Sequence, residues 1–206
     1  MAIRFLYFDL GNVLLNFSHR QACEQMGEVS GVSADKVWEV VFESSLEHRF
    51  ESGEIDDQQF YEEYCTGIGA KPEYDALLRA GSEIFSVNAP ILPLVAQLKA
   101  GCHRLGILSN TCRAHWSYCI HRRYGLLRNV FETYALSFEI GACKPNPKIF
   151  LAAAELARVE PEEIFFVDDI PSHIESAREV GFDAVLYTSV PALAAALTER
   201  GILCNY

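Results

Sequence analysis

The chain has 206 residues, half of them hydrophobic and 22% charged, and it carries a formal net charge of −11. This length suits one globular domain with a large core. The negative charge argues against a nucleic-acid partner, because phosphate backbones are bound mainly by Lys and Arg. A small phosphate ligand stays compatible with it, since a metal ion and one or two nearby cations suffice.

Cysteine usage and the length of the apolar runs indicate where the protein works. The seven cysteines include no C-x-x-C pair, so we expect reduced thiols rather than a disulfide framework. The first apolar run, residues 3–8, is too short for a signal peptide and is followed by an acidic residue. No stretch approaches the length of a membrane span. We therefore expect a cytoplasmic protein without a membrane partner.

Five short apolar runs recur along the chain and are nearly continuous rather than alternating. Such runs are typical of strands that are covered on both faces in a parallel sheet. The runs are residues 3–8, 104–108, 134–138, 164–167 and 184–187. The helical patterns that accompany them are residues 90–98, 147–156, 171–180 and 191–197. This alternation predicts an α/β fold with a doubly wound, mostly parallel sheet.

Several helix ends carry residues that favour such positions. Asn146 suits an N-cap, and Pro147 suits the first helical position. Gly101 and Gly181 stand where helices should stop. These signals support the helix boundaries predicted from periodicity.

Residues 18–86 break the alternation of strands and helices. The segment is rich in Glu, contains no strong strand, and has helical patterns at residues 37–42, 57–65 and 74–84. An insertion after the first strand lies at the carboxyl edge of the sheet, where ligands bind in such folds. We therefore expect a helical cap that acts as a lid, with residues 1–17 and 87–206 forming the core domain.

Two strands are followed by small polar segments that suit phosphate chemistry. Asp9 follows the first strand, where a carboxylate is costly to bury without compensation, and Gly11 permits a tight turn close to a ligand. Ser109 and Asn110 follow the second strand and open a helix whose free N–H groups can bind an anion. Taken alone, each segment is also explained by a turn or an ordinary N-cap.

Two later strands are followed by charged residues. Lys144 stands before Pro145 near a helix start, where it either offsets phosphate charge or lies in solvent. Asp168 and Asp169 are adjacent acids after a buried strand, and they repel each other unless a cation neutralises them. Oxygen ligands of this kind suit Mg²⁺. Helix capping before the following proline is the alternative explanation.

Together, these groups resemble the motifs of the haloacid dehalogenase (HAD) superfamily, and the resemblance covers nearly the whole chain. Asp9 matches the nucleophile of its first motif, Ser109 its second motif and Lys144 its third. Asp168 and Asp169 match the acidic fourth motif. The segments Phe-Asp-Leu-Gly-Asn-Val, Ser-Asn-Thr and Val-Asp-Asp resemble those of the family branch that contains bacterial α-D-glucose-1-phosphate phosphatases. The helical insertion resembles the small cap of that family.

The resemblance implies a Mg²⁺-dependent phosphatase that acts on a small phosphorylated substrate. In this scheme Asp9 attacks phosphorus and forms an aspartyl phosphate, which water then hydrolyses. Asp9, the Gly11 carbonyl and Asp169 hold the metal, with Asp168 close by. The phosphate-binding residues are Gly11, Asn12, Ser109, Asn110 and Lys144, of which Ser109 and Lys144 also count as catalytic.

Three further residues have no predicted role. Arg113 and His115 follow Ser109 closely, and either could face the site or lie exposed on the helix. His173 stands where the family commonly has an asparagine. Oligomeric state and the identity of the substrate are not indicated by the sequence.

One departure from the family pattern leaves alternatives open. Most family phosphatases carry a second aspartate two residues after the nucleophile, as general acid and base, and this chain has Gly11 there. A metal-independent 2-haloacid dehalogenase needs no such acid, but it would give Asp168 and Asp169 no purpose. A non-catalytic phosphate-binding protein of the same fold is the other alternative. For a phosphatase, the missing acid favours a sugar 1-phosphate, whose leaving oxygen is weakly basic.

Overall fold

The computed structural model describes residues 2–203, apart from the side chain of Arg122. Its centre is a five-stranded sheet in the order β5-β4-β1-β6-β7, and each neighbouring pair is parallel. The strands are β1 (Phe5–Phe8), β4 (Leu105–Ser109), β5 (Thr133–Leu136), β6 (Ile164–Asp168) and β7 (Asp183–Leu186). The predicted α/β fold with a parallel sheet is confirmed.

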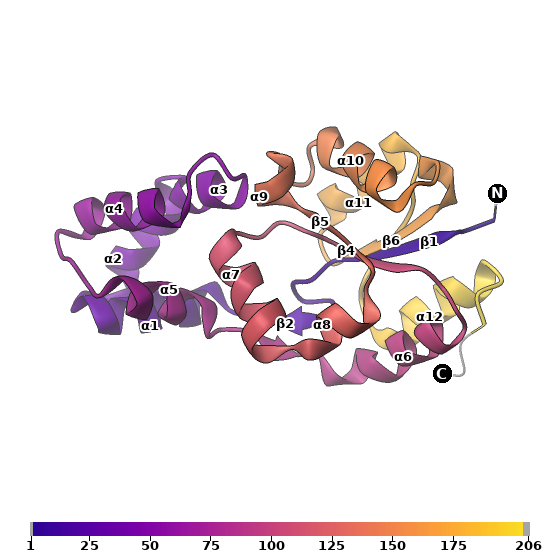
Figure 1. Cartoon of the computed structure of the whole chain (residues 1–206), viewed down its shortest axis with the longest axis horizontal. Helices are drawn as coiled ribbons and strands as arrows, with labels where there is room; N and C mark the ends of the chain where they lie inside the picture. Colours follow the sequence, from indigo (N-terminus) through magenta and orange to yellow (C-terminus); the bar gives the residue numbers. More distant parts are fainter. Residues whose placement is uncertain (1, 204–206) are drawn as a thin grey trace.

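Helices cover both faces of this sheet (Figure 1). Leu6 and Phe8 of β1 pack into one apolar layer, while Phe5 and Tyr7 pack into the other, as alternation along a strand requires. The helices of the first layer include α6 (Leu92–Ala100), α8 (Gly125–Val130) and α12 (Val190–Glu199). Those of the second are α10 (Pro147–Ala157) and α11 (Pro171–Val180). Burial on both faces explains why the strand sequences are continuously apolar.

All four predicted core helices are present, with ends close to those expected. The Asn146 side chain accepts a hydrogen bond from the Lys148 N–H and so caps α10, with Pro147 in the first turn. Gly181 ends α11 in the left-handed conformation. The helix predicted at residues 90–98 is α6, preceded by a short 3₁₀ turn, η2 (Ala89–Ile91). The remaining core elements are α7 (Arg113–Ser117), η3 (Tyr118–Arg123), α9 (Ser137–Ile140) and η4 (Pro161–Glu163).

One predicted strand is too long. Residues 137 and 138, expected at the end of the third strand, instead belong to α9. The hydroxyl of Ser137 accepts a hydrogen bond from the Thr111 N–H at 2.9 Å and donates one to the Thr111 carbonyl at 3.0 Å. These two bonds tie the start of α9 to the loop after β4, so the chain turns there rather than extending the sheet.

Between β2 (Leu15–Asn16) and β3 (Ser86–Val87), which form an antiparallel pair, the chain is helical and contains no further strand among the described residues. The helices are α1 (His19–Ser30), α2 (Ala34–Trp38), η1 (Glu39–Glu43), α3 (Leu46–Glu51), α4 (Asp57–Ile68) and α5 (Tyr74–Ser82). They gather at the end of the molecule that faces the carboxyl ends of the strands (Figure 1). We call this segment, residues 18–86, the cap; its exact boundaries stay a prediction.

The cap has an apolar cluster of its own, which contains Val37, Phe60, Tyr64 and Leu77. Cys112, at the start of α7 in the core, is buried in the same cluster, so the cap packs directly on the core. The predicted helix at residues 37–42 is split between α2 and the wider turn of η1. The sequence analysis did not predict α1 or α3.

Two further expectations concern cysteines and membranes. The cysteines within residues 2–203 are free thiols, as expected for a chain without a disulfide framework. No helix in the same residues is long and apolar enough to cross a bilayer.

Candidate active site

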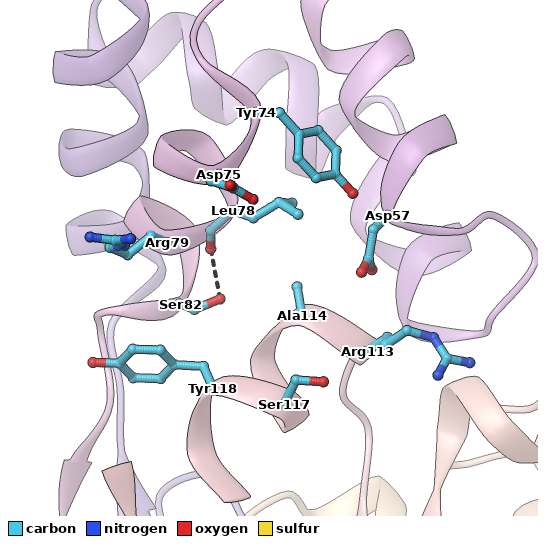
Figure 2. A pocket seen from close by; sticks show the side chains of 10 residues that line it. All are labelled: Asp57, Tyr74, Asp75, Leu78, Arg79, Ser82, Arg113, Ala114, Ser117 and Tyr118. Atoms are coloured by element: carbon cyan, nitrogen blue, oxygen red, sulfur yellow. Dashed lines mark hydrogen bonds between the residues drawn. The ribbon is translucent and has the colours of Figure 1, made fainter. Parts of the chain in front are cut away.

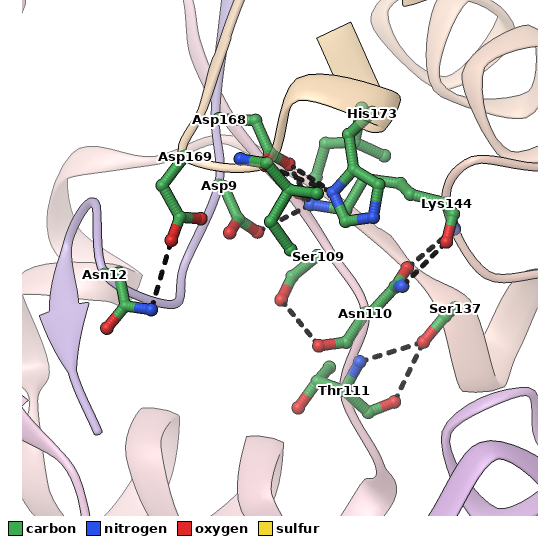
Figure 3. Close-up of polar contacts among 12 residues, drawn as sticks. Asp9, Asn12, Ser109, Asn110, Thr111, Ser137, Lys144, Asp168, Asp169 and His173 are labelled. Atoms are coloured by element: carbon green, nitrogen blue, oxygen red, sulfur yellow. Dashed lines mark hydrogen bonds and ion pairs between the residues drawn. The ribbon is translucent and has the colours of Figure 1, made fainter. Parts of the chain in front are cut away.

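Four of the predicted site residues meet at the carboxyl edge of the sheet (Figure 3). Asp9 directly follows β1, and Ser109 and Asp168 are the last residues of β4 and β6. Lys144 reaches them from the loop before α10. All four residues are buried. Because adjacent parallel strands end at the same edge, residues far apart in the sequence become neighbours.

Lys144 is the central cation of the site. Its Nζ donates hydrogen bonds to Asp9 Oδ1 at 2.7 Å, to Asp168 Oδ2 at 2.6 Å and to the Leu108 carbonyl at 3.1 Å. An ammonium group has three donors, so these contacts use all of them. Lys144 therefore holds Asp9 in place, and any contact with phosphate requires it to release one of these partners.

The charges of Lys144 and Asp168 are stabilised by their neighbours, whereas burial outweighs this stabilisation at Asp9. Burial alone would lower the pKa of Lys144, but the Asp9 and Asp168 carboxylates outweigh burial and raise it. Burial would raise the pKa of Asp168, yet Lys144 and His173 hold it at about 2. Burial, with Asp168 adding to it, raises the pKa of Asp9 to about 7 even though Lys144 opposes the change. Asp9 thus lies in a place where a further positive charge would stabilise its ionised form.

The acids also have the arrangement of a cation site. Asp9, Asp168 and Asp169 each offer a carboxylate oxygen, and these oxygens lie within 4.8 Å of one another. The Asp168 oxygens are already engaged by Lys144, by His173 Nδ1 at 3.0 and 3.1 Å and by the Ile170 N–H at 2.8 Å. Asp169 is only partly buried and has one side-chain partner among residues 2–203. Oxygen donors short of positive charge fit Mg²⁺, with Asp9 and Asp169 the freer ligands.

Residues predicted to bind phosphate mostly orient the other groups in this structure. Asn12 has a positive φ of 52° and donates from Nδ2 to Asp169 Oδ2 at 3.1 Å. The Asn110 side chain accepts from the Lys144 N–H at 2.7 Å and donates to the Lys144 carbonyl at 3.0 Å. The Gly11 carbonyl accepts from the Val13 N–H within the turn after β1. The Asn110 amide therefore fixes the loop that carries Lys144.

A small cavity lies between these groups and the cap. Its volume is about 40 Å³, which is room for only a few water molecules. On the core side it is lined by Gly11, Ser109 and Asn110, and on the cap side by Glu47 and Glu51 of α3. A phosphate ester does not fit in this space unless the cap moves.

A larger cleft, of about 300 Å³, lies between α4, α5 and α7 (Figure 2). Arg113 lines this cleft, and its guanidinium lies 5.2 Å from the centre of the Phe138 ring. His115, two residues further along α7, lines the small cavity instead. Since the cleft contains none of the four buried site residues, we place the chemistry at the small cavity.

Three residues without a predicted role lie at the site: His173, and Glu47 and Glu51, which the sequence did not single out. His173 stands in the first turn of α11, a position from which it contacts the end of the preceding strand at Asp168. Glu47 and Glu51 are one helical turn apart, which places them on one face of α3. That spacing was the available signal, but their approach to Gly11 depends on how the cap packs on the core.

Comparisons with known proteins identify the family of this chain. Residues 3–181 match the model of the haloacid dehalogenase-like hydrolase family. D-ribitol-5-phosphate phosphatase from Bacteroides thetaiotaomicron is 24% identical over 186 residues, which is 88% of this chain and 90% of the relative.

Solved structures give the same result for the fold. A HAD-like family hydrolase from Porphyromonas gingivalis superposes with a TM-score of 0.83 at 25% identity, covering 96% of this chain and 98% of the other. A HAD family enzyme from Bacteroides thetaiotaomicron, in complex with magnesium and inorganic phosphate, has a TM-score of 0.81 at 24% identity. That comparison covers 91% of this chain and 95% of the other.

Proposed function

Because this chain belongs to the haloacid dehalogenase-like hydrolases, we propose that it is a magnesium-dependent phosphomonoester hydrolase with Asp9 as its nucleophile. The observation that carries the proposal is the buried group of Asp9, Lys144 and Asp168, with Asp169 beside it. A charged group of this kind is costly to bury, and phosphoryl transfer is chemistry that uses it.

The chain's own residues have distinct tasks in this reaction. Lys144 holds Asp9 Oδ1, which leaves Oδ2 free of side-chain partners among residues 2–203 to attack phosphorus. Asp168, fixed by His173, anchors Lys144 from the other side. The resulting position of Asp9 is set before substrate arrives, which lowers the entropic cost of an in-line attack.

The metal would be held by Asp9, Asp169 and the Gly11 carbonyl. When bound there, Mg²⁺ supplies positive charge that offsets the repulsion between the Asp9 carboxylate and a phosphate dianion. The raised pKa of Asp9 supports this assignment, because it reflects a carboxylate short of compensating charge. Metal binding then explains the adjacent acids Asp168 and Asp169, whereas a metal-independent dehalogenase leaves them unexplained.

The substrate class is a phosphate monoester of a small metabolite such as a sugar or polyol. The curated relative named above acts on ribitol 5-phosphate, which supports a polyol or sugar skeleton. Gly11 supplies no acid to the leaving oxygen, which favours an aldose 1-phosphate when no other acid is at hand. The small cavity supports a cap that opens to admit substrate and closes over it.

A non-catalytic phosphate-binding protein is the second candidate, and Gly11 is the observation that favours it. The test is a phosphate-release screen of the purified chain over phosphorylated sugars and polyols, with Mg²⁺ and with EDTA. We expect Mg²⁺-dependent release that is lost in the Asp9→Asn variant. Binding of inorganic phosphate without release from any monoester would establish the non-catalytic alternative instead.

A further inference from the structure

A phosphatase that acts on an alcohol phosphate has to protonate the departing oxygen, and the turn after Asp9 cannot supply that proton. Gly11 has no side chain. A Cβ built on it would lie 2.6 Å from Cε1 of Phe17, well inside contact distance. The Phe17 ring therefore occupies the space where a side chain at position 11 would begin, and an acid has to come from another element.

The cap provides carboxyl groups on the opposite wall of the same cavity. Glu47 and Glu51 of α3 line it together with Gly11 and Ser109. The end of α3 is held against the core, because a Cβ at Gly53 would lie 2.2 Å from the Phe138 carbonyl oxygen of α9. Figure 1 shows α3 beside α9. The α3 carboxyls therefore lie across the cavity from the residues that surround Asp9.

Glu51 is the better placed of the two. Glu47 Oε1 lies 3.4 Å from Nε2 of His19, and its side chain is 27% exposed. Glu51 is partly buried, and its side chain makes no hydrogen bond or ion pair within residues 2–203. Its carboxylate is also the one that interacts with Lys144, which contacts Asp9 directly. An unpaired carboxyl group in the wall of this cavity is suited to exchange a proton with a substrate bound there.

The surroundings keep a proton on this pair near neutral pH. Burial raises the pKa of Glu51 to about 7 against the effect of Lys144, and burial with the charge of Glu51 raises that of Glu47 to about 8. Burial lowers the pKa of His19, and burial together with His19 lowers that of His115 to about 4, so neither imidazole brings a compensating charge.

The other ionisable groups around α3 add no charge that would remove the proton from Glu51. The thiols of Cys112 and Cys143 interact with Glu51, and burial raises the pKa of each, so both stay neutral. Arg49, on the same helix, is paired with Glu54 and Glu63. Lys144 is therefore the only charged partner of Glu51 among these groups.

We propose, on the basis of the proposed function, that Glu51 is the general acid and base of this site and replaces the aspartate that Gly11 lacks. As Asp9 attacks phosphorus, the bond from phosphorus to the leaving oxygen breaks, and that oxygen takes its electron pair and the proton of Glu51. Glu51, now a carboxylate, then takes a proton from the water that attacks the aspartyl phosphate. The bond from phosphorus to Asp9 breaks, and Asp9 regains its carboxylate.

The test compares esters whose leaving groups differ in basicity. We would measure kcat/KM for 4-nitrophenyl phosphate, phenyl phosphate and benzyl phosphate with wild type, Glu51→Gln and Glu47→Gln. Glu51→Gln should lower kcat/KM for benzyl phosphate about 10²–10⁴-fold and that for 4-nitrophenyl phosphate only slightly, because a nitrophenolate leaves without a proton. Glu47→Gln is the matched control, and it should affect all three esters by similar factors.

A pH profile adds a readout that a merely structural role would not change. In wild type, kcat/KM for benzyl phosphate should fall as pH rises above about 7, because Glu51 then loses its proton. The fall should be absent in Glu51→Gln. Activity toward 4-nitrophenyl phosphate reports that the variant is folded.

Two results overturn the proposal while the phosphatase assignment stands. They are an equal loss on all three esters, which indicates a structural or binding role for Glu51, and no loss on any of them. If wild type cleaves no ester and Asp9→Asn changes nothing, the proposed function itself fails, and the role of Glu51 fails with it.

Discussion

The two walls of the small cavity are built in different ways. On the core side, Ser109 lines the cavity, and the Asp9, Lys144, Asp168 and His173 side chains of the same site are buried and joined by hydrogen bonds of 2.6 to 3.1 Å; we call this side the core wall. On the cap wall, Glu51 is only partly buried and has no hydrogen-bond partner among the described residues. The core wall is thus ordered before substrate binds, whereas the cap wall has bonding capacity left for the substrate.

The core wall and the cap wall therefore have different tasks, phosphoryl transfer and discrimination between esters. The step that is common to every phosphate ester depends on the core wall, which comes from strand ends and one loop. The features that distinguish one ester from another, leaving-group basicity and size, face the cap wall. Variants of the core wall should therefore affect all substrates, and variants of the cap wall should affect some more than others.

The largest effect is expected at the nucleophile. Asp9→Asn should lower phosphate release from every ester by at least about 10³-fold, because a neutral amide cannot attack phosphorus. Thermal unfolding of the variant checks that the fold is intact. More than a tenth of wild-type activity remaining would contradict the assignment of Asp9 and with it the task of the core wall.

Removing the metal should have the second-largest effect on activity. EDTA should stop activity, and added Mg²⁺ should restore it. Asp169→Asn should weaken Mg²⁺ affinity at least about tenfold, measured by calorimetric titration, because Asp169 has an oxygen free for the metal. Asp168→Asn is the comparison, and it should act more through the loss of Lys144 anchoring than through the metal. Full phosphate release in EDTA would reject the metal role.

Stability should also distinguish the two regions. Lys144→Met leaves Asp9 and Asp168 buried without their cation, which should cost about 3–5 kcal/mol in the free energy of unfolding. Arg49→Met removes the cation of an ion-pair group on the cap, where Arg49 and Glu63 are 32% and 43% exposed, and should cost far less. Urea unfolding in EDTA measures both. Equal destabilisation would contradict the view that the core wall is the tightly coupled one.

The smallest effect concerns the contact between cap and core. Gly53→Ala introduces a Cβ that meets the Phe138 carbonyl, and it should lower turnover about tenfold by displacing α3 from its contact with α9. Gly69→Ala is the matched control, because Gly69 has nearly the same φ, 70° against 71°, but a Cβ added there would meet no atom within 4 Å. Each substitution strains the backbone, so only a loss specific to Gly53→Ala supports the role of this contact.

The core fold could be predicted from the sequence because its signals are local. Continuous apolar runs marked the five strands, and Asn146, Pro147 and Gly181 marked helix ends that the structure confirms. The cap helix α1 was missed because few of its residues are apolar, although Ser18 does cap it by accepting from the Gln21 N–H. The helix α3 was missed because six residues are too few for a periodic pattern.

The site could be predicted only in part, for a related reason. Strand ends converge in any parallel sheet, so Asp9, Ser109 and Asp168 could be expected to meet. Whether a polar side chain faces a ligand or a neighbouring loop depends on tertiary contacts. The Asn110 amide is therefore engaged by the Lys144 backbone rather than left open to phosphate, and Glu51 lines the cavity from α3, which packs against α9.

The most direct test of the account is whether a phosphoryl group becomes attached to Asp9. Wild type would be mixed with the best substrate of the screen and Mg²⁺, quenched in acid within milliseconds, digested and examined by mass spectrometry. The account predicts one phosphoryl group on the peptide that contains Asp9, labile to hydroxylamine and absent from Asp9→Asn. Rapid turnover without any such adduct, or an adduct on another residue, would contradict it.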